Sequence, residues 1–297
     1  MGGGFSTAKA EATIEHRQGG GKMELNGKRA LVLGAARGIG RAIARTLAQE
    51  GARLVLPWLD WPESVATLQT EFGSDGRHLL MAADLRQEAA VAALCSRIAQ
   101  EWGGLDIVIN NIERGGMPVV HGDYSRPLNH EEWELELDTT VRAKWLVWRQ
   151  SLPLLQRAEQ AVVVNISSIA GLVGRSGPAS LLFSDGYAVA NRALGVLTEQ
   201  WAREGAPRIR VNEVMLGLIA SRHGPGTRGW RHLTPEQRQE LSGHVLLGRT
   251  GRPEEVAQAV LFLVRDADYC TGTVLRVDGG YLLGGEPVAD MPPGLVE

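Results

Sequence analysis

Short apolar runs alternate with amphipathic stretches of helical length between residues 23 and 280, and this alternation most constrains the fold. Seven such runs are present, at residues 29–33, 53–56, 78–82, 105–109, 161–166, 209–214 and 274–277. Continuous apolar runs of this length, separated by helices, are typical of a parallel sheet that is covered on both faces. The pattern therefore predicts an α/β fold, with a single doubly wound domain around a seven-stranded parallel sheet.

Composition narrows the classes of function that this chain can have. The chain has 297 residues and a formal net charge of −3. Proteins that bind nucleic acid normally carry a strong basic excess, so we expect no nucleic-acid partner. Two cysteines, Cys95 and Cys270, are too few for a disulfide scaffold and suit a reducing compartment, so we expect a cytoplasmic protein. No run of 18 or more apolar residues is present, so we expect no membrane span.

Both ends of the chain lack the alternation. Residues 1–22 hold six of the 37 glycines and no apolar period, which predicts a flexible Gly-rich tail. They contain no apolar segment typical of a secretory signal. Gly2 and Ser6 match an N-myristoylation pattern, but we favour a Gly-rich extension because the pattern is short. We therefore expect one domain over residues 23–281 and a C-terminal tail over residues 282–297.

Three glycines with the spacing G-x-x-x-G-x-G follow the first apolar run and precede a helical stretch at residues 41–49. Glycines allow the backbone to turn tightly and to approach a pyrophosphate, which then lies at the N-terminus of the helix, where N–H groups and the helix dipole favour anions. This position between the first strand and the first helix predicts a phosphate-binding turn. Its residues are Gly34, Arg37, Gly38, Ile39 and Gly40.

The glycine spacing resembles the TGxxxGIG turn of the short-chain dehydrogenase/reductase family, with Leu33 in place of Thr. Later segments resemble further motifs of that family in the same order. They are Asp84-Leu85, Asn110-Asn111-Ile112-Glu113 (NNAG in the family), Asn165-Ile166-Ser167-Ser168 (NISS), residues 216–221 (PGxIxT) and residues 247–280 at the C-terminal end. The resemblance covers residues 25–281. It implies a Rossmann fold and an NAD(P)(H)-dependent oxidoreductase that interconverts a carbonyl and an alcohol by hydride transfer.

The resemblance also implies further contacts and partners. Asp84 and Leu85 are expected to hold the adenine of the cofactor, and Asn110, Ile219 and Ser221 to contribute to its site. The substrate would be a small-molecule carbonyl or alcohol, and no metal site is expected. Members of this family commonly pack as dimers or tetramers, so we expect a homodimer or homotetramer that forms through the helices around Trp145 and Trp201.

Two of the four catalytic positions of the family are kept in this chain and two are changed. Tyr187 corresponds to the general acid/base, and Ser168 to the residue that polarises the substrate oxygen. The lysine four residues after the tyrosine is replaced by Asn191, and the asparagine of the proton relay by Thr140. An amide can hydrogen-bond the nicotinamide ribose, but it supplies no charge to stabilise a tyrosinate. Ser168 lies 19 residues before Tyr187, more than is usual, which implies an insertion within residues 177–186.

Two residues near the changed positions could supply the missing positive charge. Lys144 lies four residues after Thr140 and so shares its helix face, whereas Arg192 should point about 100° away from Asn191. From the sequence alone we favour the interpretation of Lys144 as a surface or interface residue. Glu113 is a further departure, because the family has glycine there, beside the cofactor. Its carboxylate could contact the cofactor or point into the mouth of the cleft.

These departures leave a second function open. The chain could be a cofactor-binding homologue without ordinary dehydrogenase activity, such as a sensor or an inactive partner subunit, and a scaffold without cofactor ranks third. Residues 221–249 correspond to the variable substrate lid of the family. The lid includes Arg222, Arg228, Trp230 and Arg231, which suit an anionic, partly apolar substrate but are explained more simply as a solvated surface.

The nicotinamide cofactor is expected to be NADP(H) rather than NAD(H). A carboxylate at the end of the second strand would accept a hydrogen bond from the ribose 2′-OH and repel a 2′-phosphate, and an arginine would do the reverse. Trp58 stands at the position of that carboxylate, Asp60 lies two residues later, and Arg37 lies in the glycine turn. NAD(H) would be preferred if Asp60 folds back to the ribose.

Overall fold

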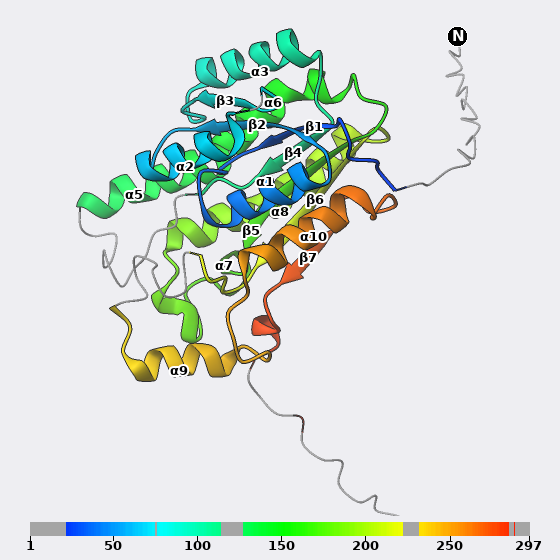
Figure 1. The fold of residues 1–297 in the computed structure, drawn as a ribbon. Coiled ribbons are helices and arrows are strands. Elements are labelled where there is room, and N and C mark those ends of the chain that lie inside the picture. The colour runs from blue at the N-terminus through cyan, green and yellow to red at the C-terminus, as the bar shows by residue number, and fades with distance from the viewer. Residues whose placement is uncertain (1–21, 75, 114–126, 222–231, 285–287, 289–297) are drawn as a thin grey trace, which may run out of the picture.

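The computed structural model describes residues 22–74, 76–113, 127–221, 232–284 and 288. Within these residues, seven strands form one parallel sheet in the order β3-β2-β1-β4-β5-β6-β7 (Figure 1). They are β1 (Arg29–Val32), β2 (Arg53–Trp58), β3 (Leu79–Ala82), β4 (Ile107–Asn110), β5 (Ala161–Ser168), β6 (Ile209–Leu216) and β7 (Val274–Val277). The predicted α/β fold with a seven-stranded parallel sheet is confirmed. The strand order reverses between β1 and β4, which is where such sheets bind their ligands.

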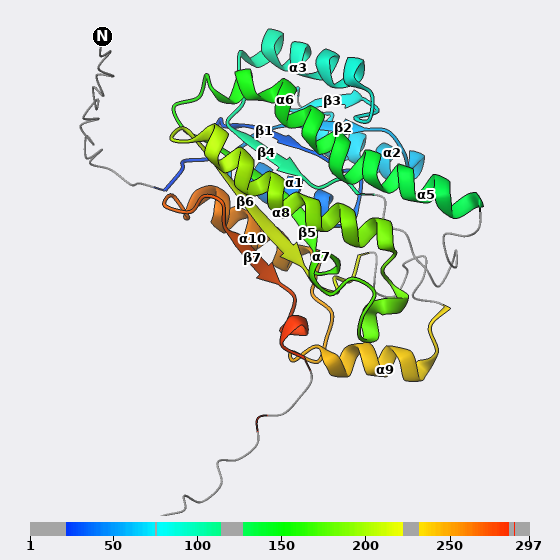
Figure 2. The same ribbon diagram turned by 180° about the vertical axis from the view of Figure 1, so that it is seen from behind.

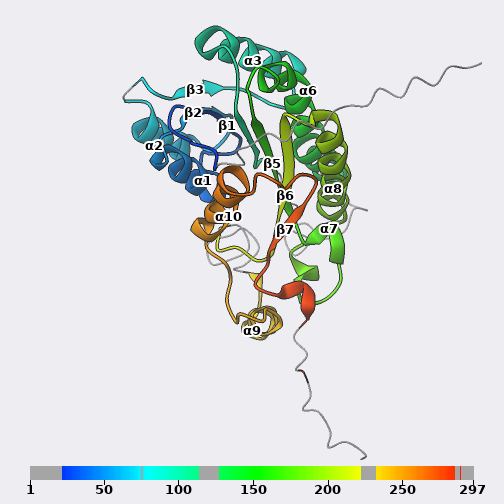
Figure 3. The same cartoon turned by 90° about the vertical axis from the view of Figure 1, so that its right-hand side faces the viewer.

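Helices cover both faces of the sheet, as the edge-on view shows (Figure 3). One layer contains α1 (Gly38–Gln49), α2 (Pro62–Phe72) and α10 (Pro253–Arg265). The other, in front of the sheet in Figure 2, contains α3 (Glu88–Trp102), α6 (Ala143–Leu155) and α8 (Asp185–Gly205). Each helix presents an apolar face to the sheet, and this burial is the main stabilising contribution to the fold.

Neighbouring residues of one strand belong to two different cores. Ala30 and Val32 of β1 pack with α1 and α10, whereas Leu31 and the following Leu33 pack with α3 and α6. Successive side chains of a strand point to opposite faces, so a strand that is buried on both faces must be apolar at every position. This requirement explains why the strands are visible in the sequence as continuous apolar runs.

A third, smaller core lies beyond the carboxyl ends of the strands (Figure 1). It is built from α7 (Ala170–Val173), the 3₁₀ turn η2 (Pro178–Leu181), α9 (Pro235–His244), the 3₁₀ turn η4 (Tyr281–Leu283) and the start of α8. The turn η2 lies within the predicted insertion. It is tied to the end of the domain, because the Ala179 N–H donates to Tyr281 Oη at 2.9 Å.

Some expectations fall on parts of the chain that the structure does not describe. Residues 1–21, which include Gly2 and Ser6, lie outside the described residues, and of residues 282–297 only 282–284 and 288 are described. In the segments that are described, no helix combines the length and the apolar character that a membrane crossing requires.

The two tryptophans of the expected subunit interface have different environments. Trp145 is exposed on α6, whereas Trp201 of α8 is buried and stacks on Trp148 with ring centroids 5.2 Å apart. Trp201 therefore stabilises the core of the subunit rather than a surface. An oligomer that forms through these helices stays a prediction.

An ion pair joins the amino ends of two adjacent strands. Asp106, which precedes β4, accepts two hydrogen bonds from the Arg29 guanidinium, at 2.7 and 3.0 Å, and one from the Arg29 backbone N–H at 2.9 Å. Burial alone would raise the pKa of Asp106, but the bonds from Arg29 outweigh it and hold the pKa below its ordinary value. This ion pair therefore contributes stability at neutral pH.

We expect Asp106→Asn to lower the free energy of unfolding by about 2 kcal/mol at pH 7, because the Arg29 charge is left without its partner. Urea unfolding measures this loss. A carboxylate with a lowered folded-state pKa stabilises above its unfolded pKa of about 3.9, so the difference should disappear as the pH falls through the folded pKa. Glu101→Gln is the control, because the Arg97–Glu101 pair is exposed and should contribute less than about 0.5 kcal/mol. A loss that does not depend on pH would contradict the assignment.

Candidate functional site

One cleft opens at the carboxyl edge of the sheet, at the point where the strand order reverses. Its walls come from the glycine turn, the segments after β2, β3 and β4, the end of β5, the start of α8 and the segment after β6. The predicted residues that line it are Gly34, Arg37, Ile39, Asp84, Leu85, Ser168, Tyr187, Ile219 and Ser221. The structure thus brings most of the predicted cofactor and catalytic residues to one place.

The glycine turn leaves no room for side chains at its glycines. Gly34 has a φ of +69°, and a Cβ atom there would lie 2.4 Å from the carbonyl oxygen of Asn111. A Cβ at Gly40 would lie 2.1 Å from the carbonyl oxygen of Gly34, and one at Gly38 would lie 2.3 Å from Ser221 Oγ. The turn is therefore in close contact with the segments that follow β4 and β6. This packing is the third role of glycine in such turns, besides the tight turn and the approach to phosphate.

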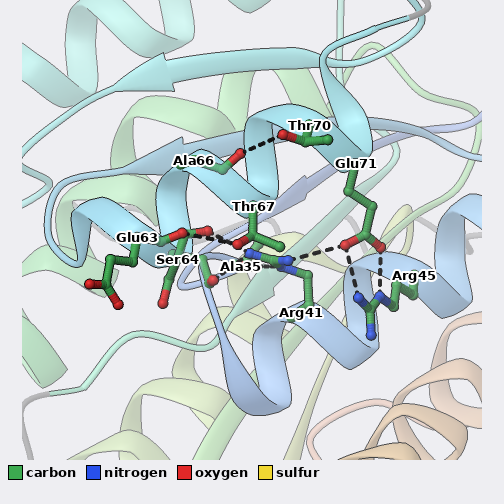
Figure 4. A network of polar contacts seen from close by, with 10 residues as sticks. Ala35, Arg41, Arg45, Glu63, Ser64, Ala66, Thr67, Thr70 and Glu71 are labelled. Carbon is green, nitrogen blue, oxygen red and sulfur yellow. Dashed lines mark hydrogen bonds and ion pairs between the residues drawn. The ribbon is translucent and has the colours of Figure 1, made fainter.

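A buried arginine of α1, Arg41, binds backbone carbonyls of both the glycine turn and α2 (Figure 4). Arg41 Nε donates to the carbonyl oxygen of Ala35 at 3.0 Å, and Arg41 Nη2 donates to the carbonyl oxygen of Ser64 in α2 at 2.7 Å. Glu71 accepts from both Arg41 and Arg45, so the charge is paired. The sequence analysis did not identify Arg41 as a site residue. The available signal was an arginine on the apolar face of the first helix.

The end of the cleft beside β2 is rich in aromatic and charged side chains. The Arg37 guanidinium lies 3.9 Å from the ring centroid of Trp61, and Trp58 and Asp60 line the same wall. Trp61 has a φ of +69°, and it is the one non-glycine residue with a positive φ among the described residues. Such backbone strain persists where the surroundings enforce it, and it is common at ligand sites. Asp60 therefore reaches the cleft together with Arg37, and both alternatives for the cofactor stay open at this point.

On the adjacent wall, Asp84 binds its neighbour Arg86 through both carboxylate oxygens, each at 2.8 Å. These hydrogen bonds outweigh burial and lower the pKa of Asp84, so its carboxylate is charged. Asn110 is fully buried and donates to Asn165 Oδ1 at 2.7 Å. The residues after Asn110, namely Asn111, Ile112 and Glu113, line the cleft in its place.

Ser168 and Tyr187 lie on the wall where β5 ends and α8 begins. Ser168 is the last residue of β5, and its Oγ accepts a hydrogen bond from the Ala170 N–H at 3.2 Å. Tyr187 lies in the first turn of α8, where Ser184 is the N-cap and its Oγ accepts from the Tyr187 N–H at 3.1 Å. The Tyr187 ring also stacks on Phe183, with centroids 5.8 Å apart. Capping and stacking hold the phenol at the cleft.

The two changed catalytic positions are buried and do not line this cleft. Asn191 Nδ2 donates to the carbonyl oxygen of Tyr187, one helical turn earlier, at 2.9 Å. Thr140 lies in a π-helical turn, η1 (Asp138–Arg142), between α5 (Pro127–Leu137) and α6, and its hydroxyl donates to Glu136 at 2.6 Å. Thr139 lines the cleft instead. That Asn191 holds the ribose and that Thr140 acts in the relay stay predictions.

Lys144 is buried, with 1% of its surface exposed, and this contradicts the interpretation of Lys144 as a surface residue. Its Nζ donates to the carbonyl oxygen of Ile166 at 2.9 Å. Burial lowers the pKa of Lys144 to about 8, against the opposing effect of carboxylates at Glu113, Glu213 and Glu136. Burial likewise raises the pKa of Glu213. The sequence offered Lys144 through its spacing from Thr140, but it did not predict the burial.

The substrate side of the cleft is described in part. Residues 222–231, and with them Arg222, Arg228, Trp230 and Arg231, lie outside the described residues. The following residues form α9, whose N-terminus has a capping box between Thr234 and Gln237. Leu241 and Val245 join the third core together with Tyr187, so the part of the lid at α9 packs in the same core as the tyrosine.

The glycine turn fits the pyrophosphate of a dinucleotide. The helix α1 begins at Gly38, and its N-cap residue Arg37 makes no side-chain capping bond. No acidic residue lies in the first turn of α1. Residues on both sides of this helix start, Gly34, Arg37 and Ile39, line the cleft, so N–H groups at the start of α1 can receive an anion. The backbone N–H donors at the start of α1, and the absence of an acidic residue in its first turn, therefore suit a phosphate group.

Comparisons with known proteins agree with this geometry. The model of a family described as enoyl-(acyl carrier protein) reductase matches residues 34–282. A 3-oxoacyl-(acyl-carrier-protein) reductase of Vibrio cholerae is 33% identical over 261 residues, which cover 87% of this chain and 98% of that protein. The corresponding reductase of Thermotoga maritima is 29% identical over 265 residues, covering 88% of this chain and 100% of that protein.

Solved structures show the same fold. A short-chain dehydrogenase/reductase of Brucella melitensis, described as a glucose/ribitol dehydrogenase, has a TM-score of 0.74 and 25% identity, and the match covers 88% of this chain and 98% of that chain. An aldohexose dehydrogenase of Thermoplasma acidophilum has a TM-score of 0.73 and 24% identity, and the match covers 92% of this chain and 100% of that chain.

We expect Gly40→Ala to lower the free energy of unfolding by about 1–3 kcal/mol, since a Cβ 2.1 Å from the Gly34 carbonyl forces the backbone apart. The same change should weaken NADPH binding at least about tenfold, because the turn no longer meets the phosphates. Urea unfolding and a fluorescence titration measure the two effects. Gly243→Ala is the matched control, because a Cβ there meets no atom within 4 Å and alanine favours the helix. Unchanged stability in Gly40→Ala would contradict the packing argument.

Proposed function

The chain belongs to the short-chain dehydrogenase/reductase family of oxidoreductases, and from this premise we propose that it interconverts a carbonyl and an alcohol by hydride transfer with NADP(H). One observation carries this proposal: Ser168 and Tyr187 line the same cleft as the glycine turn that fits a dinucleotide. We favour the direction of carbonyl reduction, because the relatives reported above are named as reductases of 3-oxoacyl groups.

In this proposal Tyr187 is the general acid and Ser168 orients the substrate oxygen. The bound nicotinamide supplies the hydride. The Tyr187 phenol donates its proton to the carbonyl oxygen as negative charge develops there, and the Ser168 hydroxyl donates a hydrogen bond to the same oxygen. Asn191 supports the tyrosine, because its amide is bound to the Tyr187 backbone.

The loss of the lysine at position 191 affects the two directions unequally. Reduction needs a neutral phenol, which is the ordinary state of tyrosine at neutral pH. Oxidation needs the phenolate, and each pKa unit by which the phenol exceeds the working pH costs about 1.4 kcal/mol. The active site is therefore better suited to reduction unless another cation acts on Tyr187.

The proposed preference for NADP(H) rests on the wall beside β2. Trp58 ends the strand where a carboxylate would bind the ribose of NAD(H), and the Arg37 guanidinium lies over Trp61 at the same wall. A guanidinium binds a 2′-phosphate through paired, charge-assisted hydrogen bonds. Asp60 lines this wall as well, so its charge opposes the preference.

The reported relatives give no support to the alternative of an inactive sensor or partner subunit, since they are named as reductases and dehydrogenases. For the substrate we propose a carbonyl compound of the 3-oxoacyl class, on the basis of these relatives. A panel of 3-oxoacyl thioesters, small ketones and aldoses, assayed with NADPH, tests that class.

We expect Tyr187→Phe to reduce turnover of NADPH and the carbonyl substrate by at least about 100-fold, because the proton donor is lost. Its affinity for NADPH should stay within about twofold, since the glycine turn is unchanged. Steady-state rates and a fluorescence titration measure both. Tyr269→Phe is the matched control, because Tyr269 is fully exposed and remote from the cleft. Turnover that survives Tyr187→Phe would refute the assignment.

We expect Arg37→Ala to weaken NADPH binding about 10- to 100-fold and NADH binding by less than about threefold, because one charged hydrogen-bond donor to the 2′-phosphate is removed. Titration of nicotinamide fluorescence measures both affinities. Arg97→Ala, on the exposed side of α3, is the control for a general loss of positive charge. Tighter binding of NADH than of NADPH by the unmodified protein would overturn the preference and assign Asp60 to the ribose.

A further inference from the structure

A buried lysine side chain ends at β5, the strand that carries Ser168. Lys144 of α6 is buried, and its Nζ lies 2.9 Å from the carbonyl oxygen of Ile166 in β5. The strand β4 ends opposite Asn165, so Ile166 is the first residue of β5 beyond the stretch that pairs with β4. Ile166 and Ala143 both line the cleft. The ammonium group therefore lies between α6 and the end of β5 and contacts the backbone of a residue that lines the cleft.

Three carboxylates from other parts of the chain act electrostatically on this ammonium group. Glu213 of β6, Glu136 of α5 and Glu113 after β4 all favour its charged form. Glu213 accepts hydrogen bonds from Ser167 and, at 3.4 Å, from Thr198, and Thr198 in turn accepts from Asn165 at 2.8 Å. Arg192 also acts on Glu213. A buried charge is costly, and here one hydrogen bond to the Ile166 carbonyl and the electrostatic effect of the carboxylates offset part of that cost.

Apolar side chains of similar size would pack here without this desolvation cost. Lys144 instead binds the carbonyl of Ile166, two residues before Ser168, and Ile166, Ser168 and Tyr187 line the same cleft. A positive charge within about 4–6 Å of a phenol favours the phenolate and lowers its pKa. The helix that carries Tyr187 has no cation one turn later, because Asn191 stands there.

We propose that Lys144 is a positioning residue that supplies from α6 the positive charge which α8 lacks at Asn191. This inference rests on the proposed role of Tyr187. The ammonium group exchanges no atom in the reaction. The phenol proton passes to the carbonyl oxygen during reduction, the hydride comes from NADPH, and the nearby ammonium stabilises the phenolate that remains.

Lys144→Met tests this proposal, because methionine has a similar length without charge. In the oxidation direction, Tyr187 must be a phenolate, so the rate rises with pH through its pKa. Loss of the cation should move that midpoint up by about 1–3 pH units and lower kcat at pH 7 about 10- to 1000-fold. The KM for the nicotinamide cofactor should change less than about twofold. In reduction, the loss at pH 7 should be smaller, since the neutral phenol is the required form.

Three further variants separate electrostatics from packing. Lys144→Arg should keep the midpoint of the pH profile for oxidation within about 0.5 pH units of the unmodified protein, since the charge remains. The double variant Lys144→Met, Asn191→Lys should recover at least about tenfold of the lost oxidation rate, because a cation returns on the tyrosine helix. Lys144→Met, Glu213→Gln removes a neighbouring carboxylate and should restore stability, measured by urea unfolding, without restoring the profile. Lys28→Met is the control for lysine loss, because Lys28 is a partly exposed residue just before β1 that lies 3.8 Å from Asp106 and does not line the cleft.

The outcomes distinguish this inference from the proposed function. If Tyr187→Phe is inactive while Lys144→Met and the unmodified protein share one pH profile, Lys144 has a structural role and the inference is overturned. If Lys144→Met folds less stably and Asn191→Lys does not rescue its profile, the inference is equally overturned. If Tyr187→Phe retains full turnover, the proposed function fails first.

Discussion

The close approach of backbone at Gly34, Gly40 and Asn111 is the constraint on which the rest of the site depends. It brings the start of α1 against the segment after β4, at the point where the strand order reverses. Arg41 holds the same turn to α2 from the opposite side. With both contacts in place, the helix N-terminus, the end of β5 and the start of α8 face one cleft. A side chain at either glycine would separate these walls before it affected any chemistry.

The fold was predictable because its signal is local and repeated. A strand buried on both faces must be apolar throughout, so each of the seven strands appears as a run, and the glycine turn appears between the first strand and the first helix. Ser168 and Tyr187 were found by motif, and the structure places both on the cleft. Arg41, the strained Trp61 and the π-helical turn at Thr140 were missed. Their conformations depend on tertiary contacts that leave no periodic pattern in the sequence.

Lys144 shows where reasoning from spacing alone fails. Spacing placed it on the face of Thr140, but an interface or surface position was favoured because lysine is rarely buried. The structure places its ammonium group among groups from four elements that are distant in the chain, namely Glu113, Glu136, Ile166 and Glu213. No short window of sequence contains these residues together. Burial of a charge is decided by the whole set of its partners, so it becomes visible when the fold is known.

An electrostatic role is defined by the position of a charge, and the helix that carries the charge can differ. Replacement of lysine by asparagine at position 191 removes a cation from α8, whereas Lys144 reaches the end of β5 from α6. The carboxylates of Glu213 and Glu136 favour the charged form of this lysine, and they would lose that electrostatic interaction if the lysine were replaced by an uncharged residue. Replacement of the lysine would therefore change the charge balance of this buried region as well as the proposed chemistry. In the proposed mechanism, the active site departs from its family motif at position 191 and keeps its positive charge through a second residue that the motif does not contain.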